Sequence, residues 1–126
     1  MTKERVYETS VAILFWDEKG FVRLNFKDTG ITYDLALAKK HLEMALEISN
    51  GLPFKILIDT RDCNLIIDKD AQDFSANISM KIAEAVIVNN LSMRILSKFY
   101  MKQNKKTPVR IFSSEEKAVA WLKGFK

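Results

Sequence analysis

The sequence is poor in the residues on which specialised small proteins depend. Its 126 residues include one cysteine, one histidine, two prolines and four glycines. A single cysteine excludes a disulfide framework within the chain, which is typical of a reducing compartment. Four scattered glycines exclude a phosphate-binding loop and a glycine-rich dinucleotide motif. The histidine has no second histidine or cysteine at metal-ligand spacing, so neither a metal site nor a cofactor is predicted.

Long apolar runs are absent as well. No run approaches the roughly 20 apolar residues that a membrane-spanning helix needs. Residues 1–10 are polar and charged, unlike a signal peptide. We therefore expect a soluble, cytoplasmic protein without a transmembrane segment.

The net charge is modest and unevenly distributed. It amounts to +4, and six basic residues occur from Arg94 to Arg110 with no acidic residue between them. Such a run is either a solvated helix face with a basic loop or a footprint for an anionic partner. Nucleic-acid binders usually combine a stronger basic bias with a recognisable module, which this chain lacks. No nucleic-acid partner is therefore expected.

The composition that is present is that of an ordinary globular protein. Apolar residues make up 48% of the chain and charged residues 29%, as in soluble domains generally. A chain of this length can build one self-sufficient core. We predict a single domain over residues 1–126, with residues 1–9 as a flexible or edge N-terminal segment.

Two short strands are predicted first. The segment Val11–Trp16 is rich in β-branched and aromatic residues, and Phe21–Phe26 alternates apolar with polar residues. The turn residues between them predict a β-hairpin whose first strand is buried on both faces and whose second strand is half exposed. A helix then extends from Thr32, as N-cap, to about Ser49, where an Asn-Gly pair ends it.

Strands and helices alternate through the rest of the chain. Phe54–Asp59 is nearly all apolar, as expected for a central strand covered on both faces. Helix-start, helix-stop and apolar patterns predict three further helices. They extend from Asp68 or Asp70 to about Ala83, over Leu91–Met101, and over Ser114–Leu122 with Ser113 as N-cap. Two further strands are predicted over Ala85–Val88 and Pro108–Phe112. The order ββαβαβαβα predicts an α/β fold. Its five-stranded mixed sheet would hold an antiparallel hairpin, then mostly parallel strands, with about four helices.

Three stretches carry a resemblance to a known family. They are FKILIDTRD (Phe54–Asp62), AEAVIVNNLSMRIL (Ala83–Leu96) and TPVRIFSSEEKAVAWL (Thr107–Leu122). With the order of elements, they resemble the STAS/SEC14-like superfamily. More narrowly, the chain is similar to the small stand-alone SpoIIAA-like proteins found in many bacteria, including Bacteroidetes. The resemblance implies the SpoIIAA-like fold and a regulatory role.

The same resemblance implies a phosphorylation position. In anti-sigma-factor antagonists of this fold, a comparable strand is followed by Asp-Ser-Ser-Gly or a similar motif, and a partner kinase phosphorylates the second position. Thr60 keeps a hydroxyl at that place, whereas Arg61 and Asp62 replace the Ser and Gly that follow. SEC14-like relatives bind lipid in an apolar cavity, but they are much longer than this chain.

Polar residues follow three of the predicted parallel strands. In open α/β sheets, ligands bind beyond the carboxyl ends of the strands, where helix N-termini favour anions. The candidates for binding or for a phospho-switch at this edge are Asp59, Thr60, Arg61, Asn89, Asn90, Arg94 and Ser113. Either arginine could complete an anion site. The alternative is that these residues are only helix caps and turn residues.

Other notable side chains have simpler interpretations. His41 is predicted to be a solvated helix residue, and Cys63 a buried or loop thiol. Core packing, an oligomer interface or an apolar pocket could each explain the abundant aromatic residues, which are Trp16, Phe21, Phe99, Tyr100, Phe112 and Trp121.

Two functional hypotheses of different classes follow, both without catalysis. The first is a regulatory or protein-interaction module that docks a protein partner or a second copy of itself, as a homodimer, through the loop Asp59–Cys63. The alternative is a binding protein for a small anionic or lipid-like ligand at the strand-end anion site. An enzyme using Asp59 or Cys63 would need a base within about 3 Å, and no sequence signal indicates one.

Overall fold

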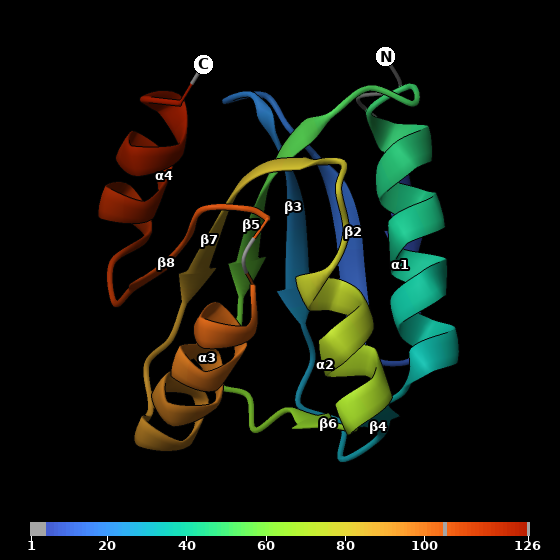
Figure 1. The fold of residues 1–126 in the computed structure, drawn as a ribbon, viewed down its shortest axis with the longest axis vertical. Helices are drawn as coiled ribbons and strands as arrows, with labels where there is room; N and C mark the ends of the chain where they lie inside the picture. The colour runs from blue at the N-terminus through green and yellow to red at the C-terminus, as the bar shows by residue number, and fades with distance from the viewer. Residues whose placement is uncertain (1–4, 105, 126) are drawn as a thin grey trace.

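A six-stranded mixed sheet forms the centre of the computed structural model, which describes residues 5–104 and 106–125 (Figure 1). The strands, in their order across the sheet, are β1 (Val6–Glu8), β2 (Ala12–Asp17), β3 (Phe21–Phe26), β5 (Phe54–Asp59), β7 (Lys81–Ile87) and β8 (Val109–Phe112). Strands β1, β2 and β3 pair antiparallel, and β3, β5, β7 and β8 pair parallel. The predicted antiparallel hairpin and parallel run are therefore confirmed.

Four helices cover the two faces of the sheet. They are α1 (Leu35–Ile48), α2 (Lys69–Ala76), α3 (Leu91–Gln103) and α4 (Glu115–Lys123). Because side chains alternate along a strand, Leu24 and Ile56 face α1, whereas Phe21, Leu57 and Ala85 face α4. Helices α2 and α3 lie with α1 on one side of the sheet, so α4 alone packs on the other.

The number of strands was predicted wrongly. The sheet has six strands rather than five, because Val6–Glu8 pairs with β2 at one edge. A two-stranded parallel sheet, β4 (Thr32–Tyr33) with β6 (Ile66–Ile67), is also present. These two strands are too short to show a period of two, so the sequence pattern could not reveal them.

The burial predicted for the hairpin is reversed. Strand β3 lies between β2 and β5, and its residues Phe21 to Leu24 are all buried. Strand β2 is only half-buried at Ile13 and from Phe15 onward. The polar residue Arg23 made β3 look exposed, but ion pairs allow its guanidinium to be buried.

Several boundaries differ from their predictions. Asp34, not Thr32, caps α1, and Ser114, not Ser113, caps α4 by accepting a hydrogen bond from the Lys117 amide. Helix α2 ends at Ala76 instead of reaching Ala83, because residues from Lys81 onward pair with β5. Strand β7 is therefore seven residues long and begins before Ala85.

His41 was also predicted wrongly. It is buried under the sheet instead of solvated, and its ring hydrogen-bonds the Tyr33 hydroxyl at 3.2 Å and Thr9 Oγ1 at 2.9 Å. Burial lowers its pKa to about 4, so the ring is neutral at pH 7. It belongs to the buried stripe of α1, at helical spacing from Ala38 and Ala45.

Candidate functional site

The carboxyl ends of the parallel strands do meet at one edge of the sheet, as predicted. There the strand-end cluster forms from Arg23, Asp59, Arg61 and Glu115. Arg23 donates to Asp59 at 3.0 Å and to both oxygens of Glu115 at 3.0 and 3.1 Å. Arg61 donates to Asp59 at 2.7 Å and to Glu115 at 2.7 Å.

Electrostatics hold both carboxyl groups of this cluster in their ionised form. Hydrogen bonds from Arg23 and then Arg61 lower the pKa of Glu115 to about 2. Burial opposes ionisation of Asp59, but hydrogen bonds from Arg61 and Arg23 outweigh it and bring its pKa below the usual range. Both guanidinium groups are thus bound to carboxylates, and the cluster ties β3, β5 and α4 together instead of offering an open anion site.

Thr60, the predicted phospho-switch position, follows the end of β5. It is buried, and its hydroxyl donates to the Ile87 carbonyl oxygen at 2.7 Å. Asn89 hydrogen-bonds Asp62 through its side-chain oxygen and nitrogen, each at 2.9 Å. Asn90 caps α3 and donates to the Cys63 carbonyl oxygen at 3.1 Å. These contacts match the turn and cap interpretation.

The other predicted residues, Arg94, Ser113 and Cys63, are not members of the strand-end cluster. Arg94 is half-buried on the first turn of α3, and Ser113 is exposed in the turn before α4. Cys63 is buried, its thiol donates to the Lys27 carbonyl oxygen at 3.6 Å, and burial raises its pKa. A raised thiol pKa disfavours the nucleophilic thiolate.

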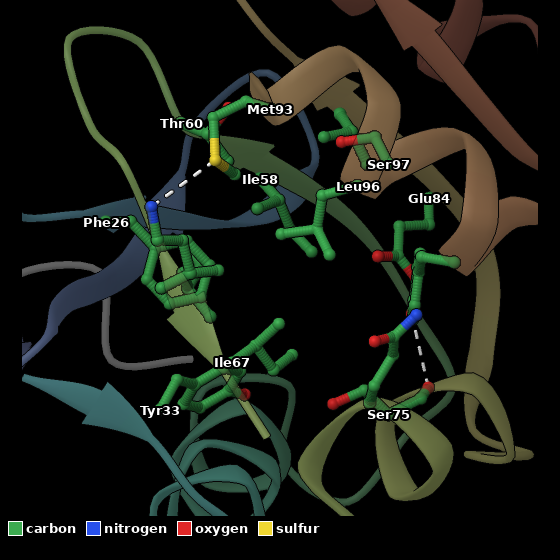
Figure 2. A pocket seen from close by; sticks show the side chains of 15 residues that line it. Phe26, Tyr33, Ile58, Thr60, Ile67, Ser75, Glu84, Met93, Leu96 and Ser97 are labelled. Carbon is green, nitrogen blue, oxygen red and sulfur yellow. Dashed lines mark hydrogen bonds between the residues drawn. The ribbon is translucent and has the colours of Figure 1, made fainter. Parts of the chain in front are cut away.

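A separate site lies on the other face of the sheet, between β3, β5, β7 and helices α2 and α3. It is a cavity of about 80 Å³, and Figure 2 shows it from close by. Its walls are largely apolar, formed by Leu24, Phe26, Ile58, Leu65, Ile67, Val86, Met93 and Leu96. In Figure 2, Ser97, Glu84 and Ser75 lie along the right-hand side of the cavity, and Phe26 lies on its left.

Glu84 is the charged residue of this wall, and it is 0% exposed. Its Oε1 accepts from Lys81 Nζ at 2.5 Å and from the Tyr100 hydroxyl at 2.8 Å. Lys81 Nζ also donates to the Ser75 carbonyl oxygen at 2.9 Å and to Tyr100 at 2.8 Å. Desolvation, followed by the Glu84 charge, raises the pKa of Tyr100 well above its usual value. We call Lys81, Glu84 and Tyr100 the cavity cluster.

Polar contacts join α2 to α3 beside this cavity. Gln72, which lines the cavity, donates to Gln103 Oε1 at 2.5 Å, and Gln103 Nε2 donates to Asp73 at 2.8 Å. Gln103 is exposed, whereas Gln72 and Asp73 are half-buried. Exposed hydrogen bonds of this kind cost little to break.

Comparison with known proteins places this architecture in a family. The model of the family described as a domain of unknown function, DUF7793, matches residues 15–126. The chain belongs to this DUF7793 family. No curated protein matches it.

A solved structure identifies the fold of this DUF7793 domain. The structure is an uncharacterised protein of the DUF3478 family with a SpoIIAA-like fold, from Shewanella loihica PV-4. The two chains are 10% identical and superpose with a TM-score of 0.60 over 94% of this chain and 90% of that chain. The predicted SpoIIAA-like fold is therefore confirmed.

The outer face of α3 carries an exposed apolar stripe in the DUF7793 domain. Leu91, Ile95 and Phe99 are exposed at helical spacing, with 71%, 47% and 60% of their surface accessible. Basic side chains accompany them, at Lys98 and Lys102. The stripe lies on one face of an amphipathic helix. Within the described residues, no helix is long and apolar enough to cross a membrane.

Sequence reasoning missed the residues that distinguish both sites. Neither Arg23 nor Glu115 was among the predicted site residues, yet they are joined across 92 positions of the chain. Glu84 carried one usable signal, because it is the only charged residue in the apolar run Ala83–Val88. An acidic residue inside a central strand must find a buried partner.

Proposed function

We propose that this protein is a non-enzymatic binding protein for a small, mostly apolar ligand held in the cavity between the sheet and helices α2 and α3. The observation that carries the proposal is an apolar cavity that contains one buried carboxylate. An engineered apolar cavity of roughly 150 Å³ holds benzene, which has six non-hydrogen atoms, so about 80 Å³ suits a molecule of roughly three to four non-hydrogen atoms.

This proposal places the ligand at a different site from the one that the sequence-based alternative predicted. That alternative used an anion site at the strand ends, where Arg23 and Arg61 now prove to be occupied by Asp59 and Glu115. The cavity offers apolar walls and a carboxylate instead. A ligand site with apolar walls and few convergent polar groups is the common pattern for small molecules.

The proposal can be tested by filling the cavity. Ser97 is buried against it, so Ser97→Leu places an isobutyl group in the ligand space, whereas Ser92→Leu adds the same group at an exposed position of α3. Titration of the protein with 1-propanol, followed by two-dimensional NMR, is expected to give saturable shifts at cavity residues of the native chain and of Ser92→Leu. Loss of these shifts in Ser97→Leu supports the proposal. Equal saturable binding by Ser97→Leu would refute it.

A second function is favoured by the apolar stripe of α3. We infer a protein-interaction surface formed by this stripe and the loop Asp59–Cys63, which Asn89 and Asn90 join to the start of α3. Basic side chains flank the stripe, so a second copy docking on the same face would bring like charges together. An acidic protein partner therefore fits this surface better than a homodimer does.

Matched surface variants test the interaction surface. Phe99 and Val6 have nearly equal exposed fractions, 60% and 61%, on α3 and on the edge strand β1. Phe99→Ser is expected to abolish capture of an acidic partner from the host, and Val6→Ser to leave it unchanged. Capture should also weaken as salt screens the basic side chains. A captured protein that both variants retain equally would count against this surface.

A further inference from the structure

In the cavity cluster, some polar atoms have all their hydrogen-bond partners, whereas one carboxylate oxygen has none among the described residues. Lys81 Nζ has three donors, and it has three partners, which are Glu84, Tyr100 and the Ser75 carbonyl oxygen. Glu84 Oε1 accepts from Lys81 and Tyr100. Glu84 Oε2, in contrast, is buried and has no hydrogen-bond partner among the described residues.

A buried carboxylate oxygen without a hydrogen-bond partner destabilises the folded state. Leaving a buried polar group without a hydrogen bond costs about 1–3 kcal/mol, and more for a charged group. Glu84 lines the cavity together with the hydroxyls of Ser75 and Ser97. Those hydroxyls can donate or accept, whereas an ionised carboxylate only accepts. Glu84 Oε2 is therefore a hydrogen-bond acceptor in this wall that has no donor among the described residues.

We infer that the ligand is a small aliphatic molecule headed by a hydrogen-bond donor, an alcohol or a primary amine, which donates to Glu84 Oε2 while its hydrocarbon body fills the apolar side of the cavity. This inference rests on the proposed ligand-binding function. It also states what the site rejects. A carboxylate-headed molecule such as a short fatty acid would place its charge against Glu84, and an ether would offer only a second acceptor.

Ligands of matched size test the inference on the unmodified protein. 1-Propanol and ethyl methyl ether are isomers with four non-hydrogen atoms, but only the alcohol donates; propylamine donates as a cation, and acetate carries a negative charge. We expect the alcohol or the amine to bind at least about tenfold more tightly than the ether, as judged by NMR titration. Acetate is expected to bind more weakly than the ether.

A variant then reverses the preference. In Glu84→Gln, the hydrogen bonds from Lys81 and Tyr100 hold the amide oxygen in the place of Oε1, so the amide nitrogen faces the cavity as a donor. The alcohol-to-ether affinity ratio should fall at least about tenfold. Because this variant leaves Lys81 without its counter-ion, Lys81→Met combined with Glu84→Gln serves as a charge-balanced version. If neither variant folds, the native ligand series alone decides.

The outcomes separate this inference from the function on which it rests. Equal affinity of the alcohol and the ether, with both displaced by Ser97→Leu, would overturn donor selection and leave the binding function standing. Failure of every molecule in the series to bind would overturn both. A preference for acetate would overturn the inference outright, because a carboxylate head offers Glu84 Oε2 no donor.

Discussion

The strand-end cluster and the cavity cluster both bury charged groups, on opposite faces of the same sheet, but they differ in how completely those groups are paired. Arg23 and Arg61 meet two carboxylates whose oxygens are bound by several donors. In the cavity cluster, one oxygen of Glu84 has no partner among the described residues.

The difference teaches which buried polar group to examine for function. A saturated network rigidifies the fold and leaves nothing for a ligand to satisfy. A buried acceptor without a donor, in contrast, can accept a hydrogen bond from a ligand. The contacts of the strand-end residues therefore have a structural explanation, and the proposed ligand site rests on the cavity cluster instead.

The largest effect is expected from a substitution that breaks the cavity cluster. Lys81→Met leaves Glu84 buried without its cation, and we expect a loss of about 3–5 kcal/mol in the free energy of unfolding. Lys69→Met is the matched control, because Lys69 forms an ion pair with Asp73 while its side chain is 85% exposed, and such pairs contribute about 0.5 kcal/mol or less. Urea denaturation measures both. Equal losses would show that burial of the pair is not decisive.

The next prediction compares the buried and the partly exposed arginine of the strand-end cluster. Arg23 is buried and Arg61 is partly exposed, although both bind Asp59 and Glu115. We expect Arg23→Met to cost about 3 kcal/mol of unfolding free energy and Arg61→Met about 1 kcal/mol. Urea midpoints at pH 7 test this order. A larger loss for Arg61→Met would assign the main structural contacts to the loop instead of the strand.

A third prediction uses His41, whose ring hydrogen-bonds the cavity-lining Tyr33. Its folded pKa of about 4 lies below the ordinary 6.5, so on acidification the unfolded chain takes up a proton before the folded one does. Stability should fall by about 2 kcal/mol between pH 6.5 and 4.5 from this group alone. Urea unfolding across this range should show the slope in the native chain, and His41→Gln should lack it. An identical slope in the variant would assign the effect to other groups.

The smallest effect concerns Glu115 in the strand-end cluster. Its folded pKa of about 2 lies below the ordinary 4.5, so its contribution is present above pH 4.5 and is lost as the pH falls toward 2. Because the side chain is partly exposed, we expect it to contribute about 1 kcal/mol or less. The difference in unfolding free energy between the native chain and Glu115→Gln should shrink over that window. A difference that stays constant would show that the ion pairs do not stabilise the fold.

Local pattern was enough to predict most of the elements. Strands β3 and β5 have the predicted bounds, and the caps Asp68 and Asn90 start α2 and α3. These features depend on side chains close together in the chain, since periodicity and capping are local interactions. Where local signals conflicted, as in residues 77–83 before the apolar run of β7, the helix was extended too far.

The sequence by itself determined the alternation of strands and helices, and with it the α/β class and the edge of the sheet where polar residues gather. Only the tertiary structure decided which polar residues are paired. Arg23 meets Glu115 because crossover connections bring β3 and the start of α4 together. Glu84 borders a cavity because α2 and α3 lie over β7 without filling the space above it. Both outcomes depend on packing between distant segments. Local periodicity reveals neither which distant residue a side chain contacts nor where packing leaves a cavity.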